Sequence, residues 1–344
     1  MTGVNVIDDQ VVPGKDLSAE SIEIIQLLAD GEFHSGEELG RLLGVSRAAV
    51  WKRLQLLQPL LGLHFESVRG QGYRLAGGIE LLDGARVQAA MPPAVRSGLS
   101  RFEVHALIDS TNRRAAQLAQ AGVDACTVIV AEQQTAGSGR RGRRWISPFG
   151  RNIYCSMLWA FDGGVAALEG LSLVVGLVVA RIIAPLTDRH VQLKWPNDVL
   201  VDGRKIAGIL LEVAGDVDGR CTVVIGVGLN VNMAGADETA GIEQAWCDVS
   251  SIARSPVSRN DLLTALIVQL VQALRIFEQK GFAAFREDWS SRDYLAGSEV
   301  SIESGGQCQY GTALGLDESG ALLVEIDGVT RAIHGGEVSV RLQR

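Results

Sequence analysis

The strongest restriction on the fold of this chain is a helix-turn-helix pattern in the segment SGEELGRLLGVSRAAVWKRLQLL. Val50, Leu54 and Leu57 recur at i, i+4 and i+7, which is the spacing of one buried helix face. Ser46 is a favourable N-cap for that helix, and Gly44 permits a tight turn before it. We therefore expect two short helices joined by a glycine-containing turn.

The basic residues concentrate around this pattern and in the segment HFESVRGQGYRLAGG, which predicts two short strands and completes a winged helix. The chain has a formal net charge of −8, yet residues 41–75 hold Glu66 as their single acid beside Arg41, Arg47, Lys52, Arg53, Arg69 and Arg74. A protein that binds the major groove of DNA needs a helix that fits the groove, with basic side chains around it that neutralise the phosphates. The residues expected to contact DNA are Ser46, Arg47, Trp51, Lys52 and Arg69. The alternative is a protein-docking module with a solvated basic face.

The rest of the 344 residues predicts a long region of strands and helices, followed by a small antiparallel barrel. Strand-like runs such as TVIVAE, IYCSMLW and CTVVIGVGLNV alternate with helical patterns, and one long helix is expected from about Asn260 to Gly281. The last 48 residues divide into VSIES, CQYGTALGL, ALLVEID and EVSVRL, separated by glycine turns.

No feature of the sequence suggests export or a membrane span. The run LSLVVGLVVA is about half the length of a span, so a buried helix or strand is expected there. The chain opens MTGVNVIDDQ, with acids where a signal peptide carries bases. The five cysteines are scattered without a CxxC pair. A reducing cytoplasm fits best.

The stretch GSGRRGRRW, from Gly137 to Trp145, matches the letters of the dinucleotide-binding fingerprint but not its context. A Rossmann loop must open a helix, whereas here Ser147–Gly150 interrupt and a strand-like run follows. What remains is a glycine-flexible, arginine-rich loop between two strands (the Arg loop, residues 137–145). Guanidinium groups match phosphate geometry, so a phosphate ligand is expected, with a solvated loop or a DNA contact as the alternatives.

Four further polar segments accompany the Arg loop: IDSTN, LKWPNDVLV, GRKIAGIL and GVGLNVN. The small side chains of IDSTN suit a polar, uncharged ligand, although the segment could equally well be the N-cap of the helix that follows. Lys194 and Lys205 near the Arg loop suit a site that neutralises a polyphosphate and a carboxylate.

Taken together, the motifs STN, AEQQTAGSGRRGRRW, SPFG, KWPND, GRKIAGIL and GVGLNVN resemble those of the biotin protein ligases. With the winged helix in front, the chain resembles the bifunctional bacterial biotin ligases that also repress the biotin operon. The resemblance implies an α+β multidomain fold, with a central mixed α/β domain similar to class II synthetases and a C-terminal SH3-like barrel. The expected division is a flexible tail (1–17), the winged helix (18–76), a linker (77–81), the ligase domain (82–296) and the barrel (297–344).

The resemblance also implies roles for individual residues. Arg140 and Lys205 would be catalytic, Arg140 on the adenylate phosphate and Lys205 on the biotin carboxylate or its acyl oxygen. The biotin-binding set would be Ser110, Thr111, Asn112, Gln134, Ser138, Gly139, Arg140 and Lys205, and the ATP-binding set Arg140, Arg143, Asn197, Asn230 and Trp246. One departure concerns Ser138: many members have arginine there, so this loop carries one cation fewer.

The activity that the resemblance implies consumes biotin and ATP, with Mg²⁺, and makes biotinyl-5′-AMP. A lysine of the biotin carboxyl carrier protein of acetyl-CoA carboxylase then receives the biotin. The other implied partners are biotin operator DNA and a second copy of the chain when the adenylate is bound. Two alternatives compete: a biotin-sensing regulator without ligase activity, and a lipoate ligase of related fold.

Overall fold

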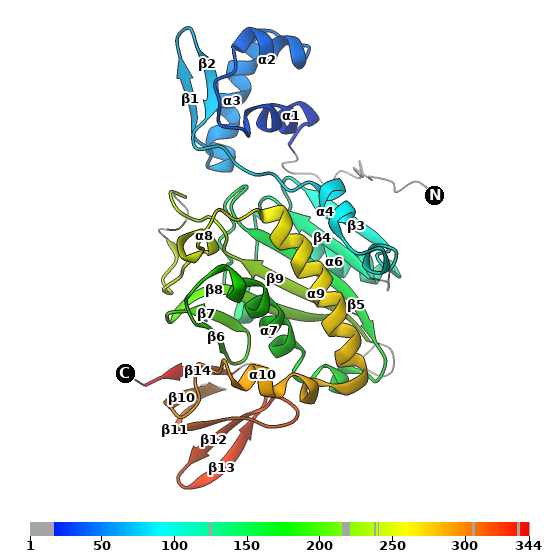
Figure 1. Cartoon of the computed structure of the whole chain (residues 1–344), viewed down its shortest axis with the longest axis vertical. Helices are drawn as coiled ribbons and strands as arrows, with labels where there is room; N and C mark the ends of the chain where they lie inside the picture. The colour runs from blue at the N-terminus through cyan, green and yellow to red at the C-terminus, as the bar shows by residue number, and fades with distance from the viewer. Residues whose placement is uncertain are drawn as a thin grey trace.

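A computed structural model describes residues 17–123, 126–214, 221–236, 239, 241–304, 307–335 and 338–343. Three units follow one another along the long axis of the molecule (Figure 1): a small helical unit, a large central sheet with helices, and a second, smaller sheet. The tail expected over residues 1–17 lies, except for Leu17, outside the described residues.

The N-terminal unit is the winged helix-turn-helix that the sequence predicts. It consists of α1 (Ala19–Leu28), α2 (Gly36–Leu42), α3 (Arg47–Leu61) and the antiparallel hairpin of β1 (Phe65–Val68) and β2 (Gly72–Leu75). The Ser46 side chain caps α3 by accepting a hydrogen bond from the Ala49 amide at 3.2 Å. Val50, Leu54 and Leu57 are all at most 2% exposed, so the helical stripe forms the core of this unit.

The central unit is a seven-stranded mixed sheet in the order β3-β4-β5-β9-β8-β7-β6. The pair β3–β4 is parallel and the other neighbours are antiparallel. The strands are β3 (Arg101–His105), β4 (Thr127–Ala131), β5 (Ile153–Phe161), β6 (Val191–Lys194), β7 (Asp198–Val201), β8 (Arg204–Ala214) and β9 (Cys221–Leu229). Adjacent residues pack on opposite faces, as Met157 and Leu158 do, and both faces are covered.

Helices cover the two faces of this sheet unequally. On the face toward the viewer in Figure 1 lie α7 (Leu171–Ile183) and α9 (Arg259–Lys280), which join the large core, and α6 (Thr111–Gln120) covers the other face. Two helical stretches, residues 165–186 and 259–280, are long and apolar enough to span a bilayer, but 67% and 56% of their apolar windows are buried in the fold. They are core helices, and the run Leu171–Ala180 is a buried helix. The shorter helices are α4 (Gly84–Ala90), α5 (Pro93–Arg96), α8 (Val249–Ile252) and α10 (Arg286–Ser290).

The C-terminal unit is an antiparallel sheet of five strands in the order β13-β12-β11-β10-β14. These are β10 (Glu299–Ser304), β11 (Gln307–Leu316), β12 (Leu322–Ile326), β13 (Val329–Ile333) and β14 (Ser339–Leu342). Four of them match the strands expected from the sequence. The sequence pattern does not predict β13, because four of its five residues are exposed and it pairs only with β12, at the sheet edge.

The loop that follows the Arg loop packs against the winged helix and so joins the central unit to it through side-chain contacts. Phe149 is 2% exposed and belongs to the hydrophobic cluster of the N-terminal unit, where Ile79 and Leu81 also pack. The neighbouring Glu80 accepts hydrogen bonds from the Ser258 hydroxyl and the Asn260 amide group at the start of α9. The segment between the two units is therefore fixed on both sides.

Candidate active site

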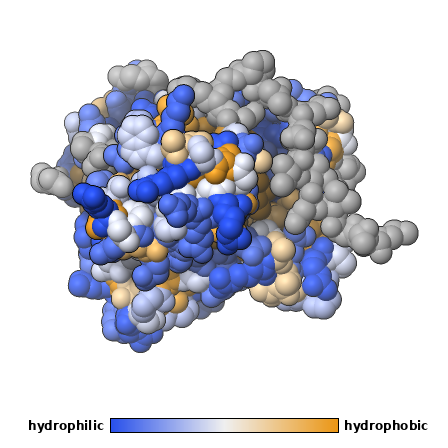
Figure 2. Space-filling model, turned by 90° about the horizontal axis from the view of Figure 1, so that it is seen from above, coloured by the Kyte–Doolittle hydropathy of each residue, from blue (hydrophilic) through white to orange (hydrophobic). Residues whose placement is uncertain are grey.

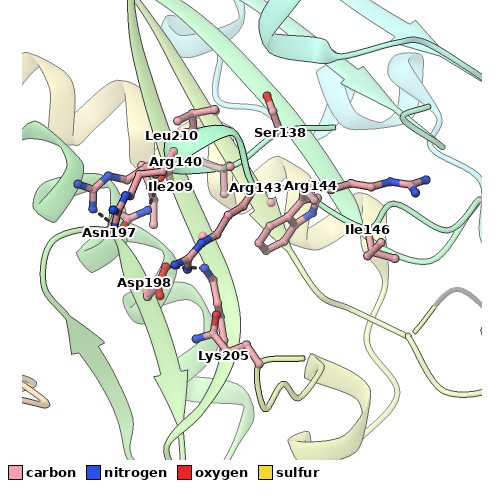
Figure 3. Close-up of a pocket in the computed structure, with 18 of the residues that line it drawn as sticks. Ser138, Arg140, Arg143, Arg144, Ile146, Asn197, Asp198, Lys205, Ile209 and Leu210 are labelled. Atoms are coloured by element: carbon pink, nitrogen blue, oxygen red, sulfur yellow. Dashed lines mark hydrogen bonds and ion pairs between the residues drawn. The ribbon is translucent and has the colours of Figure 1, made fainter. Parts of the chain in front are cut away.

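A single cavity of about 910 Å³ collects every residue that the sequence analysis assigned to biotin or ATP. Its walls come from the N-terminus of α6, the Arg loop, strands β5, β7, β8 and β9, residues 241–246, and strand β14 of the C-terminal sheet. Figure 3 shows Arg140, Asn197 and Lys205 among the lining side chains. The assigned residues that line it are Ser110, Thr111, Asn112, Gln134, Ser138, Gly139, Arg140, Arg143, Asn197, Lys205, Asn230 and Trp246. The residues assigned to DNA lie outside it, on the N-terminal unit.

A row of hydrogen-bonded polar side chains forms one end of the cavity. Ser110 is the N-cap of α6, so its capping role and its position in the cavity coexist. The backbone amide of Thr111 and its hydroxyl both donate to Gln134 Oε1, at 2.9 and 3.1 Å. The buried Ser156 hydroxyl lies 2.7 Å from Thr111 Oγ1 and 2.6 Å from Asn112 Oδ1. Such a row can orient an uncharged ligand that has both donors and acceptors.

Trp145, the last residue of the Arg loop, forms an apolar wall beside this row. Its indole lies flat over two glycines of the sheet: a methyl group at Gly228 would lie 2.5 Å from Trp145 Cε2, and one at Gly208 would lie 3.0 Å from Cζ3. These positions therefore have to lack a side chain. The Lys205 ammonium is 5.5 Å from the centroid of the Trp145 ring, a cation–π distance.

The Arg loop is a tight hairpin that places Arg140 against two other elements. Ser138 pairs with Arg144 across the hairpin, and the Gly139 amide donates to the Arg143 carbonyl at 2.7 Å. Arg140 Nη1 donates to Asn197 Oδ1 at 3.1 Å, and its Nη2 donates to the Val338 carbonyl, in the segment before β14, at 3.4 Å. The Arg loop thus connects the central sheet to the C-terminal sheet. In Figure 3 Ser138 lies at the opposite end of the labelled group from Lys205.

Lys205 and Asp198 form an ion pair on neighbouring strands, with Nζ and Oδ1 2.6 Å apart. The Lys205 backbone holds residues 245–247 beside it, because its amide donates to Ala245 and its carbonyl accepts from Cys247. Asn230, 4% exposed, donates from its side chain to the Cys247 carbonyl. Asn230 and Lys205 therefore position the half-buried Trp246 as part of the cavity wall.

Cations crowd this half of the cavity. Burial lowers the pKa of Lys194; Asp198 partly offsets this effect, and the charges of Lys205, Arg341 and Arg143 lower the pKa further. Burial also lowers the pKa of Arg140, and Asp198 again acts in the opposite direction. Cations that are desolvated and repel one another are stabilised by an anionic ligand, so this end of the cavity favours a polyanion.

The sequence matches the model of the biotin/lipoate A/B protein ligase family over residues 104–230, a helix-turn-helix domain over 21–74 and the C-terminal domain of biotin protein ligases over 296–341. The bifunctional ligase/repressor BirA of Salmonella typhimurium is 42% identical, and the alignment covers 93% of this chain and 97% of that protein. The same protein of Escherichia coli is 40% identical with the same coverage. The chain belongs to the family of bifunctional biotin protein ligases and repressors.

The structure also resembles that of a biotin protein ligase over most of the chain. The biotin protein ligase of Aquifex aeolicus, solved in complex with biotin and ATP, superposes with a TM-score of 0.61 at 29% identity, covering 71% of this chain and all of that one. This member of the biotin ligase family therefore combines an enzyme fold with an N-terminal DNA-binding domain.

Several cavity residues were not assigned a role from the sequence. Trp145 is the last residue of the Arg loop, but its role in the cavity wall depends on the glycines of β8 and β9 that face it. Asp198 follows Asn197 directly, yet its pairing with Lys205 depends on strand neighbours. Residues 338–341 come from the far end of the chain, and no local pattern places them in the cavity.

The residues expected to contact DNA are all exposed on the winged helix. Ser46, Arg47, Trp51 and Lys52 are exposed at or after the start of α3, and Arg69 is exposed in the β1–β2 turn. Figure 2 views the molecule from this end and shows a mainly hydrophilic surface with small apolar patches. A methyl group at Gly36 would approach Arg47 Cγ at 2.9 Å, so α2 fixes the base of the Arg47 side chain. A helix flanked by cations at this position suits duplex DNA.

Proposed function

We propose that this biotin ligase family member activates biotin with ATP to biotinyl-5′-AMP and then transfers the biotin to a lysine of a biotin carboxyl carrier protein. The observation that carries the proposal is the division of one cavity into two chemistries. The polar row on α6 and the Trp145 wall suit a small ring with amide-like groups. The cations at the other end suit phosphates.

The biotin ring would lie at the α6 end. Ser110, Thr111, Asn112 and Gln134 would bind its ureido group, since they supply donors and acceptors in a fixed pattern; the first three side chains are buried. Trp145 would pack on the apolar part of the ring, and the chain of the ligand would run past Ser138 and Gly139 toward Lys205. A wall of indole and glycine leaves room for a flat apolar group but offers it little hydrogen bonding.

The chemistry would need no protein nucleophile. The biotin carboxylate attacks the α-phosphorus of ATP, an acyl–phosphate bond forms, and the bond to pyrophosphate breaks. A carrier lysine in its neutral form then attacks the acyl carbon, forms an amide, and releases AMP and one proton. Arg140 and Lys205 would be the catalytic residues, because positioned cations stabilise the charge that develops on the phosphorus and acyl oxygens.

The nucleotide would occupy the opposite end. Arg143 would contact phosphate, while Asn197 orients Arg140 and Asn230 supports the segment that carries Trp246, where the adenine would pack. Mg²⁺ is commonly held by one or two carboxylates together with substrate phosphates, and the Asp198 carboxylate in the cavity fits that pattern. The metal would neutralise the phosphates.

The winged helix would bind the biotin operator through Ser46, Arg47, Trp51, Lys52 and Arg69, and the adenylate-bound chain would do so as a homodimer in the cytoplasm. The side chains proposed to bind the operator are all exposed, and three of them are basic, which supports DNA binding. We also propose domain boundaries at 18–76, 82–296 and 297–344.

The test is a transfer assay with the purified chain, biotin, ATP, Mg²⁺ and a carrier protein, followed by mass spectrometry of the carrier. We expect one added biotinyl group, which depends on ATP and is lost when the acceptor lysine is replaced by arginine. An unmodified carrier, under conditions in which the chain binds biotin, would favour a biotin-sensing regulator without ligase activity.

A further inference from the structure

Glu212, on β8 outside the set of residues that line the cavity, is tied to the biotin end through one hydrogen bond. Its Oε2 accepts from Asn112 Nδ2 at 2.6 Å. Asn112 itself is 6% exposed and lines the cavity. We propose that Glu212 is a positioning residue that fixes which face of the Asn112 amide meets the ligand; this inference rests on the proposed biotin site.

The Asn112 amide has little freedom other than a flip about its terminal bond. A methyl group at Gly226 would overlap the oxygen, the carbon and the nitrogen of the Asn112 amide. This amide therefore lies flat on the backbone of β9. Ser156 is completely buried on β5 and contacts Asn112 Oδ1 at 2.6 Å from another side. Packing fixes the plane of the amide and leaves open which end carries the oxygen.

Glu212 decides that orientation because a carboxylate accepts hydrogen bonds and cannot donate them. If the amide flipped, two acceptor oxygens would face each other across a hydrogen-bond distance. Ser156 gives no such preference, since its hydroxyl can donate or accept. The Asn112 oxygen is therefore held as an acceptor beside Ser156, with a second lone pair free to accept from a ligand N–H.

At the other end of the polar row, a group that can only donate hydrogen bonds fixes the orientation of the Gln134 amide. The Thr111 backbone amide can only donate, so it fixes the acceptor oxygen of Gln134 toward itself. The Gln134 amide nitrogen then donates to Ser147 Oγ at 3.3 Å. One pure acceptor and one pure donor thus set the polarity of the whole row. A ureido group has N–H donors on both sides of its carbonyl, so a row of fixed polarity can select it.

The experiment compares three substitutions of Glu212 in the full chain, with direct titration of biotin in the absence of ATP. Glu212→Gln keeps an acceptor oxygen and should bind biotin within about twofold of the wild type. Glu212→Leu removes the acceptor and should weaken biotin binding roughly tenfold, the cost of one misoriented hydrogen bond. Glu212→Lys offers a donor that favours the flipped amide, and should weaken binding at least as much as Glu212→Leu.

Two controls separate positioning from general damage. Glu287→Lys reverses a charge on the exposed surface of α10 and should leave biotin affinity unchanged. In an Asn112→Ala background, Glu212→Leu should have no further effect on biotin binding, and the KM for ATP should stay unchanged throughout. Wild-type affinity in both Glu212→Leu and Glu212→Lys, or a full effect in the Asn112→Ala background, would overturn the inference. A wild-type chain that does not bind biotin would instead refute the proposed function.

Discussion

Lys205 Nζ lies 2.6 Å from Asp198 Oδ1, and this ion pair sits in the cavity where the Arg loop and the cations of β6 and β14 meet. The side chains are 19% and 17% exposed, so neither charge is freely solvated. The pair places a cation beside the position expected for the reacting carboxylate, and holds a carboxylate where a phosphate-bound metal would fit.

Replacing Lys205 should therefore slow the activation step more than it weakens substrate binding. In Lys205→Ala the Asp198 carboxylate is left without its partner near incoming phosphates, and the developing charge loses one donor. We expect the rate of adenylate formation to fall roughly 100-fold or more. Rapid-quench measurement of biotinyl-AMP would check this result. Lys280→Ala, at the exposed end of α9, is the matched control, and an adenylation rate near that of the wild type in Lys205→Ala would refute the catalytic role.

Arg140 should retain the adenylate rather than support the fold. It holds Asn197 on the central sheet and the Val338 carbonyl in the C-terminal unit, so its loss opens the cavity at the Arg loop. Arg140→Gly should release biotinyl-AMP at least roughly tenfold faster, the loss of a charge-assisted hydrogen bond, with little change in the melting temperature. Dissociation of preformed adenylate followed on a filter would measure this rate. Tight retention by Arg140→Gly would contradict the role assigned to it.

Arg47 and Lys52 should contribute to DNA binding without affecting the enzyme. Each phosphate contact releases counterions, so each of Arg47→Ala and Lys52→Ala should reduce the slope of log affinity against log salt by about 1. Fluorescence anisotropy with a random-sequence duplex measures this slope, and Arg331→Ala, on the exposed β13, serves as the control. Unchanged slopes in both variants would favour a protein-docking role for the winged helix.

Glu103 on β3 should make stability depend on pH in the acid range. Burial by itself would raise its pKa, but hydrogen bonds from His105 and Arg114 and their charges lower it to about 2, from a usual value of 4.5. Because the pKa is lower in the folded state, the stabilisation is fully present above about pH 4.5 and is lost as the pH falls toward 2. Its size is at most about 3 kcal/mol.

Urea unfolding of the wild type and of Glu103→Gln at a series of acid pH values tests this linkage. The difference in free energy of unfolding between them should shrink as the pH falls from 5. A difference that stays constant over that range would show that the Glu103 charge is not the stabilising feature.

The sequence predicted the elements whose information is local. Val50, Leu54 and Leu57 lie on one face of one helix, and the interruption at Ser147–Gly150 is enough to exclude a Rossmann loop. The helix expected from Asn260 begins at Arg259 and ends before Gly281, which has a φ of +60°. In these cases spacing, capping and turn residues act within a few positions of one another.

Contacts between residues far apart in the sequence could not be predicted in this way. Trp145 meets Gly208 and Gly228 only because β8 and β9 are neighbours in the sheet, and nothing near Trp145 records that pairing. The contact between Arg140 and Val338 joins residues almost 200 positions apart. Strand β13 was not predicted, because an exposed edge strand has no buried face and therefore no alternation of apolar and polar residues.

The most direct test of the central claim is exchange of labelled pyrophosphate into ATP, measured with the purified chain in the absence of any carrier protein. We expect exchange that requires biotin, because adenylation is reversible and uses only groups within this cavity. No exchange under conditions in which biotin binds would contradict the proposed adenylation. The cavity would then belong to a sensor, and the arginines of residues 137–145 would need another ligand.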